Sequence, residues 1–151
     1  MKQVIARLWR IIRGPMQWRL LWLAHAKFMV GVTGVVRDGQ GRVLLLRHRL
    51  RPEGRQWGLP TGYAIKGEEF GATVAREVRE ETGLDVKAGR LVHLKSGYRL
   101  RVEVAYEAQF LGGDLAIDSF EILEARWFTP EELPDGMQES RRLLIRGETP
   151  N

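Results

Sequence analysis

Residues 62–84 read GYAIKGEEFGATVAREVREETGL and carry most of the structural information in the chain. In the second half of this stretch, apolar and charged residues recur with a helical period, which predicts a helix from Glu68 or Glu69 to Thr82. Gly83 follows as the expected C-terminal cap. The helix has one apolar side that needs a partner, so the stretch predicts a helix packed inside a larger domain.

Three glutamates of this predicted helix share one side. At about 100° per residue, Glu77, Glu80 and Glu81 fall within an arc of about 100°. Like charges this close repel each other and need compensation. Arg76 or Arg79 could supply part of it, and a hard divalent cation such as Mg²⁺ or Mn²⁺ could supply the rest. The same pattern also fits an exposed acidic helix with Glu–Arg pairs one turn apart.

Strand patterns lie on both sides of this helix. A pair of strands over 28–37 and 42–50 is joined by a turn, and a loop rich in Gly and Pro follows over 51–62. Further strands are predicted at 86–94, 98–111 and 125–128, with a helical turn at 130–133 and a final helix at 138–145. Strands around a central helix, with a second helix at the end, predict an α/β sandwich.

The stretch from residue 62 to residue 84 resembles the Nudix box, G-x5-E-x7-R-E-U-x-E-E-x-G-U, in which U is a bulky aliphatic residue. Every fixed position is matched, by Gly62, Glu68, Arg76, Glu77, Val78, Glu80, Glu81, Gly83 and Leu84. Residues 57–60 (WGLP) and 121–128 also look like family segments, and the resemblance covers roughly residues 28–130. It implies a Nudix-type α/β/α sandwich with a mixed β-sheet over 28–151, preceded by an added helical extension over 1–27.

The resemblance implies a hydrolase that cleaves a nucleoside diphosphate linked to another moiety, by attack of water on phosphorus. Glu77, Glu80 and Glu81 would hold Mg²⁺, for which Mn²⁺ is a substitute, and Glu77 could instead be the general base. Many family members have glycine where this chain has Thr61, whose carbonyl would be a further metal ligand. A later carboxylate commonly completes such a site, and Glu121 is the candidate here, with Glu124 behind it.

Three further residues of the motif have supporting roles by the same resemblance. Glu68 and Arg76 would form a pair that fixes the loop after Gly62 against the helix, and such outer partners set the orientation of metal ligands. In many other members a glycine stands at the position of Thr61, and glycine allows a wider range of backbone angles. Thr61 is therefore where the chain departs from the family pattern, and the exact geometry of this loop depends on it.

Candidate substrate-binding residues lie outside the helix. Arg47, Arg49 and Arg55 precede the motif and could clamp phosphate oxygens, although Arg47 and Arg49 also fit a solvent-facing strand edge. Trp57 and Tyr98 could stack on a base or serve only in packing. The proline of ADP-ribose members and the downstream motif of NADH-type members are missing. The substrate stays open among nucleoside triphosphates, nucleotide sugars, dinucleoside polyphosphates, and capped or triphosphorylated RNA.

Composition and charge limit the remaining function classes. The 151-residue chain suits one globular domain, and the absence of cysteine excludes disulfides, thiolate metal sites and cysteine nucleophiles. A reducing compartment fits, so we expect a cytoplasmic protein. The formal charge is +5, but residues 1–36 hold six Lys and Arg residues and no carboxylate, against 18 basic and 19 acidic residues afterwards. The main domain is nearly neutral, so DNA binding is not expected.

The basic extension, residues 1–27, reads as an amphipathic helix over 1–14 and a second helical piece over 16–26. It is too short in apolar sequence to cross a membrane. It could cover a face of the domain or a homodimer partner, contact anionic lipid through tryptophans and arginines, or serve in targeting. Two alternatives to a nucleotide pyrophosphohydrolase follow: a Nudix-fold nucleotide sensor without activity, and a membrane-associated hydrolase of a lipid-linked diphosphate.

Overall fold

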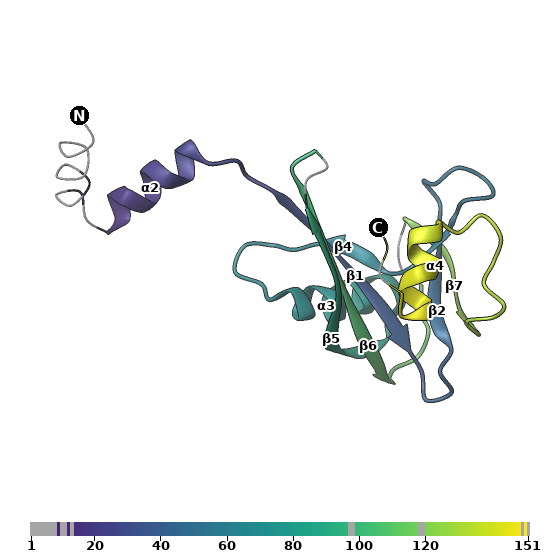
Figure 1. Ribbon diagram of the computed structural model, residues 1–151. Helices are drawn as coiled ribbons and strands as arrows, with labels where there is room; N and C mark the ends of the chain where they lie inside the picture. The colour runs from purple at the N-terminus through teal and green to yellow at the C-terminus, as the bar shows by residue number, and fades with distance from the viewer. Residues whose placement is uncertain are drawn as a thin grey trace.

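The computed structural model describes residues 9, 12, 14–96, 99–117, 120–148 and 150. Its elements are α2 (Pro15–Ala24), β1 (Met29–Arg37), β2 (Val43–His48), β3 (Trp57–Gly58), β4 (Thr61–Tyr63), α3 (Phe70–Thr82), β5 (Asp85–Ser96), β6 (Arg101–Gly112), β7 (Ile122–Phe128) and α4 (Glu139–Arg146). Figure 1 shows α3 and α4 packed around the strands, while α2 projects away from them.

The described strands form one open, mixed sheet. The order β3-β2-β1-β6-β5 forms its main path, while β4 pairs with β1 and β7 pairs with β2. The β1–β6 pair is parallel and runs from Met29 opposite Arg101 to Arg37 opposite Gln109, whereas the other pairs are antiparallel. The predicted mixed sheet is therefore confirmed, and it brings β4 next to the start of β1.

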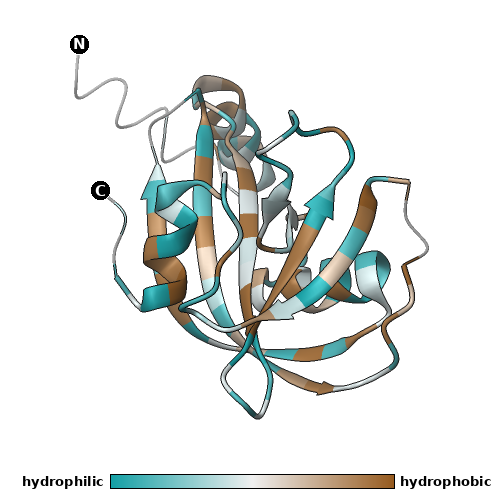
Figure 2. Ribbon diagram, turned by 90° about the vertical axis from the view of Figure 1, so that its right-hand side faces the viewer, coloured by the Kyte–Doolittle hydropathy of each residue, from teal (hydrophilic) through white to brown (hydrophobic). Residues whose placement is uncertain are grey.

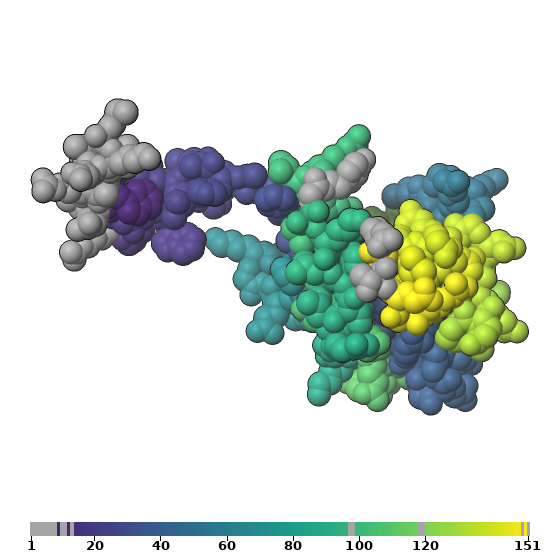
Figure 3. All heavy atoms as spheres, in the orientation of Figure 1, coloured from purple at the N-terminus to yellow at the C-terminus, as the bar shows by residue number. Residues whose placement is uncertain are grey.

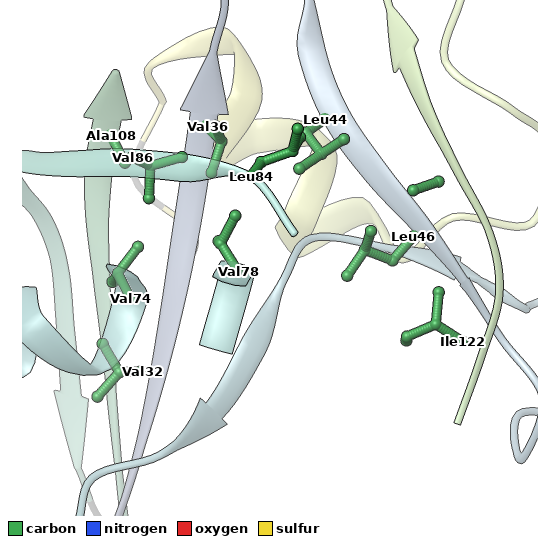
Figure 4. Packing of buried hydrophobic residues seen from close by; sticks show 11 residues of the cluster. Val32, Val36, Leu44, Leu46, Val74, Val78, Leu84, Val86, Ala108 and Ile122 are labelled. Atoms are coloured by element: carbon green, nitrogen blue, oxygen red, sulfur yellow. The ribbon is translucent and has the colours of Figure 1, made fainter. Parts of the chain in front are cut away.

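Hydrophobic residues cover both faces of this sheet, because successive side chains of a strand point to opposite faces. Alternating bands of hydropathy along the strands are visible in Figure 2. One cluster packs α3 against β1 and β2, through Val32, Val36, Leu44, Leu46, Val74 and Val78 (Figure 4). The other packs α4 against the opposite face, through Val35, Val43, Leu45, Leu144 and Ile145. The predicted sandwich is thus observed.

The central helix has nearly the predicted bounds. It begins at Phe70 after Glu69, which has an extended backbone, and it ends before Gly83, whose φ is +74°. Its buried residues are Thr73, Val74, Val78 and Thr82. The side of α3 that carries the glutamates lies beside this packed side, so packing of the valines fixes the direction in which the carboxylates point.

Several details differ from the sequence expectations, among them the three that follow. The loop predicted over 51–62 contains β3 and β4, which are too short for a periodic pattern and are held by pairing with β2 and β1. The predicted helical turn at 130–133 is only a hydrogen-bonded turn, from the Glu132 amide to the Thr129 carbonyl. Pro134 follows directly, and the residue before a proline is disfavoured in a helix. Strand β2 ends at His48 rather than at residue 50.

The extension is described only in part. The predicted helix over 1–14 lies outside the described residues except for positions 9, 12 and 14. The second piece forms α2, none of whose ten residues is buried, and the space-filling view in Figure 3 shows it standing apart from the sheet. Helix α2 therefore does not cover a face of the domain. In the described part of the chain, every helix is too short or too polar to cross a membrane.

Candidate active site

Arg76 lies at the centre of an ion-pair network on α3. Its Nε donates to Glu68 Oε1 at 2.8 Å and its Nη2 to Glu68 Oε2 at 3.2 Å. Its Nη1 donates to Glu77 Oε1 at 2.7 Å and to Glu80 Oε2 at 3.1 Å. The Nη2 also donates to the carbonyl of Tyr63 at 3.1 Å, so one guanidinium ties the end of β4 to the helix.

Glu68 is the most strongly held carboxylate of the motif. It accepts hydrogen bonds from Thr73 Oγ1 at 2.8 Å and from the Ile65 amide at 3.3 Å, in addition to those from Arg76. The hydrogen bonds from Arg76 lower the pKa of Glu68 to about 2, against the opposing effect of burial. Glu68 in turn raises the pKa of Arg76. The pair therefore stays ionised and fixes the loop, which is the geometry expected of the supporting pair.

Gly62 lies directly against the side chain of Glu77. A Cβ atom at position 62 would sit 1.9 Å from Glu77 Cδ. The neighbouring Thr61 has no positive φ, so its β-branched side chain fits the extended backbone of β4. Its hydroxyl donates to the Leu59 carbonyl at 3.1 Å and lies 3.0 Å from Thr33 Oγ1. The threonine thus anchors β4 without straining the loop.

Glu81 differs from its neighbours because no arginine compensates its charge at short range. Its Oε2 is buried and has no hydrogen-bond partner in the described part of the chain. Burial, together with the negative charges of Glu77 and Glu121, raises the pKa of Glu81 to about 8, and Arg51 opposes this only in part. Repulsion and desolvation of this kind are what a bound cation would relieve.

Glu81 lines a cavity of about 310 Å³ beside the motif. The other lining residues are His48, Leu50, Arg51, Thr61, Tyr63, Arg101 and Glu121. Two of them are carboxylates, Glu81 and Glu121, which we call the acidic lining. Two are guanidinium groups, Arg51 and Arg101, which we call the basic lining. A cavity with both is suited to a cation and a polyanion bound together.

The basic lining is positioned by close packing. Arg51 Nη1 lies within 2.1 Å of where a Cβ at Gly58 would be, and it donates to the Trp57 carbonyl at 3.4 Å. Burial lowers the pKa of Arg51, and Glu81 counteracts this. Arg101 stands over the Tyr63 ring at 5.4 Å and donates from Nη1 to its hydroxyl at 3.1 Å.

Two further groups lie near this cavity. Arg141 of α4 donates from Nη1 to Thr33 Oγ1 at 2.9 Å, and Thr33 in turn contacts Thr61. Burial lowers the pKa of Arg141, Glu103 opposes that, and Arg51 and Arg101 add to it. The imidazole of His48, with a buried Nε2 that has no partner among the described residues, has its pKa lowered to about 4 by burial and by Arg51. His48 is therefore neutral near pH 7.

The arginines expected from the sequence to bind phosphate do not line this cavity, and their role stays a prediction. Arg47 pairs with Glu124 at 3.3 Å across β2 and β7. Arg49 donates to the Phe120 carbonyl at 2.9 Å and stands over that ring at 5.2 Å. Arg55 is exposed in the loop before β3.

Of the two residues expected to stack on a base, the structure describes only Trp57. Trp57 packs edge-to-face on Phe128, with ring centroids 5.1 Å apart, in the core beneath α4. Tyr98 lies outside the described residues. None of Arg47, Arg49, Arg55 and Trp57 lines the cavity beside Glu81. Arg51 and Arg101, which do, have no local sequence signal.

The carboxylate side chains around the cavity are arranged only in part as a metal site. No group of three acidic or histidine side chains in the described part of the chain converges as a ready-made metal cage. Arg76 explains this in part, because it already contacts one oxygen each of Glu77 and Glu80. The buried, unpartnered Oε2 of Glu81 and the clustered negative charge still fit an oxygen-binding cation. A larger depression of about 550 Å³ between α3 and β5 contains none of the motif's glutamates.

An α/β sandwich whose central helix presents a glutamate-rich motif over a mixed sheet defines a class of protein, and the comparisons place the chain in it. A family profile for the NUDIX domain matches residues 27–146. Among relatives, "NAD-capped RNA hydrolase NudC" of Enterobacter sp. (strain 638) is 37% identical over 104 residues, and that of Escherichia coli (strain K12 / DH10B) is 36% identical over 104 residues. These alignments cover 68% of this chain and 39% of each relative, so the chain corresponds to well under half of those proteins.

Solved structures agree. A MutT NUDIX hydrolase from Burkholderia pseudomallei has a TM-score of 0.68 at 25% identity, over 82% of this chain and 100% of that one. An ADP-ribose pyrophosphatase from Streptococcus suis has a TM-score of 0.63 at 25% identity, over 79% and 89% of the two chains. The chain belongs to the Nudix family of hydrolases.

Proposed function

We propose that the protein is a Mg²⁺-dependent pyrophosphohydrolase that cleaves the diphosphate linkage of a nucleotide derivative. The observation that carries the proposal is the cavity in which the acidic lining, Glu81 and Glu121, lies beside the basic lining, Arg51 and Arg101. Carboxylates alone would repel a diphosphate, whereas arginines bind its oxygens through paired hydrogen bonds. A site that holds both groups is organised to bind a cation and a diphosphate together.

Glu77, Glu80 and Glu81 are the residues that would hold the metal, with the Thr61 carbonyl and Glu121 as further oxygen donors. When bound, Mg²⁺, or Mn²⁺ in its place, would neutralise phosphate charge and lower the pKa of a coordinated water. Glu68 and Arg76 keep α3 and the loop before it in fixed relation, because their ion pair is bidentate. The proposed ligands are thus held by residues that touch neither metal nor substrate.

The remaining residues have defined tasks. Arg51 and Arg101 bind non-bridging phosphate oxygens and orient phosphorus toward the carboxylates. Tyr63, half exposed at the cavity and already in contact with Arg101, offers an aromatic surface to a base or ribose. Glu77, or Glu81 through its unpartnered Oε2, accepts a proton from the attacking water. The leaving group departs as a phosphate whose charge the arginines stabilise.

The substrate class is a nucleoside diphosphate joined to a second moiety. Relatives named as an NAD-capped RNA hydrolase and a structural neighbour named as an ADP-ribose pyrophosphatase both support a diphosphate flanked by ribose on each side. This chain lacks the downstream motif of NADH-type members and the proline of ADP-ribose members, so neither relative's substrate is transferred directly.

Product analysis tests this proposal. Nucleoside triphosphates, nucleotide sugars, ADP-ribose, NAD, dinucleoside polyphosphates, lipid diphosphates, and capped and 5′-triphosphate RNA are incubated with Mg²⁺, with Mn²⁺ and with EDTA. The Glu81→Gln variant serves as the blank. We expect metal-dependent release of a nucleoside monophosphate from one class of compound. Nucleotide binding without turnover would favour a sensor, and turnover of lipid diphosphates alone would overturn the nucleotide assignment.

A further inference from the structure

Helix α2 exposes apolar side chains on all sides. Trp18, Trp22 and Leu23 are 75%, 64% and 68% exposed, and no residue of Pro15–Ala24 is buried. A helix that is apolar all round is normally enclosed by protein or lipid. Isolated helices of this length are also marginal in water, so α2 needs an external partner.

The apolar surface continues onto the end of the domain from which α2 projects. Phe28 and Met29 are exposed where β1 begins. The Met29 amide donates to the Leu100 carbonyl at 2.9 Å, which brings the exposed side chain of Leu100 to the same end of the sheet. Ile65, 61% exposed, lies in the loop just after β4, next to the start of β1. We call residues 14–29 with Ile65 and Leu100 the docking surface.

Charge identifies the partner. Residues 1–36 contain six Lys and Arg residues and no Asp or Glu. In the described part, Arg19 and Lys27 are exposed, and Lys27 Nζ stands 4.4 Å from the centroid of the Trp22 ring. A second copy of the extension would bring basic residues against basic residues. An anionic lipid surface instead offers negative headgroups above an apolar layer, where tryptophan is favoured.

We propose that the docking surface binds the face of an anionic lipid bilayer. Helix α2 lies in the interfacial layer, with its tryptophans and leucines among the acyl chains and with Arg19 and the following Lys27 at the headgroups. At 10 residues, or about 15 Å, it rests in one leaflet and does not span the membrane. Two residues that line the candidate active site adjoin this surface, because Arg101 directly follows Leu100 and Tyr63 lies two residues before Ile65. Docking therefore places the cavity close to the membrane surface.

Sedimentation of the 151-residue chain with vesicles tests this proposal. The vesicles are phosphatidylcholine alone or phosphatidylcholine with 30% phosphatidylglycerol. The variants are Trp18→Ala/Trp22→Ala and Arg19→Gln/Lys27→Gln. The matched control is Leu111→Ala/Arg146→Gln, which removes an exposed apolar residue and exposed positive charge at positions outside the docking surface. Thermal unfolding of each variant checks that the domain is intact, which is expected because α2 buries nothing.

We expect the wild type and the control to sediment with the anionic vesicles. With the neutral vesicles, both proteins should stay in the supernatant. Removing the two basic residues should weaken partitioning by about fivefold each. Removing the tryptophans should abolish sedimentation. Equal recovery with both kinds of vesicle, or binding that survives loss of the tryptophans, would overturn the proposal. So would a dimer in light scattering that the tryptophan variant dissociates, because the occupant would then be a second copy of this chain.

Discussion

The glutamates of α3 and the basic lining of the cavity are positioned in different ways. Glu77, Glu80 and Glu81, which we call the acidic side, lie within five consecutive residues of one packed helix, whereas Glu121 of the acidic lining comes from a separate segment. The basic side combines Arg51, from the loop after β2, with Arg101, from the first residue of β6. These two residues meet only because the sheet brings distant segments together.

The difference has a physical consequence. Glutamates on one helix keep their relative positions whenever the helix forms, so the geometry of the acidic side is local. The arginines depend on contacts that each makes separately, Arg51 with Gly58 and Arg101 with Tyr63. We therefore expect the acidic side to carry the chemical step and the basic side to carry substrate affinity and choice.

The largest effect is expected from the substitution Glu81→Gln on the acidic side. The substitution replaces a proposed, negatively charged metal ligand with a neutral amide of the same size. Turnover should therefore fall by more than about a hundredfold, which exceeds the usual effect of losing a residue that only supports a metal ligand. Steady-state kinetics at saturating Mg²⁺ measure it, with Glu131→Gln, an exposed carboxylate in a turn, as the control. Wild-type turnover in Glu81→Gln would remove Glu81 from the proposed metal site.

The next test changes the space beside Glu77 without changing any charge on the acidic side. The substitution Gly62→Ala places a Cβ 1.9 Å from Glu77 Cδ and must displace that carboxylate. We expect a loss of about 1–3 kcal/mol of stability, typical of overpacking, and a drop of about tenfold or more in turnover. Gly39→Ala is the control, since a Cβ there meets nothing within 4 Å. Equal melting temperatures for both variants would contradict the close fit of Glu77.

A smaller effect is expected on the basic side. Arg51→Gln and Arg101→Gln should each raise KM about tenfold, the cost of one hydrogen bond to a charged group, with less change in kcat. Arg55→Gln, in the same loop as Arg51 but exposed and outside the cavity, is the matched control. If Arg55→Gln raised KM more than Arg51→Gln did, Arg55 would be the phosphate-binding residue, as the sequence predicted.

The smallest effect concerns the ion pair that supports the acidic side. The pKa of Glu68 is about 2 in the folded protein and 4.5 when unperturbed, so its ionised form favours folding. This contribution is complete above pH 4.5 and is lost as pH falls toward 2. Glu68→Gln should flatten the decline in denaturation midpoint over that range, whereas Glu69→Gln, which caps nothing through its side chain, should not. If the denaturation midpoints of the wild type, Glu68→Gln and Glu69→Gln fell in parallel with pH, the stabilising role of the Glu68–Arg76 pair would be refuted.

The sequence predicted the local features of this site better than the distant ones. The helix and its glycine cap follow from the local residue pattern, the Glu68–Arg76 pair follows from the family resemblance over the same 23 residues, and the structure has all three. Arg47 and Arg49 carried an equally plausible pattern, but β7 supplies Glu124 opposite Arg47, a contact that period-two alternation cannot foresee. The strands β3 and β4 were missed because pairing with β2 and β1, rather than their own composition, makes them strands.

The parallel β1–β6 pair also constrains how the protein can be made. Met29 and Arg101 are partners 72 positions apart, and no shorter connection joins these strands. During synthesis at about 5–20 residues per second, β1 must wait several seconds before β6 leaves the ribosome. Over that interval the valine-rich edge of β1 has no parallel partner. Arg101 and Arg51 cannot meet before then, so the nascent chain acquires the acidic helix of its site before it acquires the complete cavity.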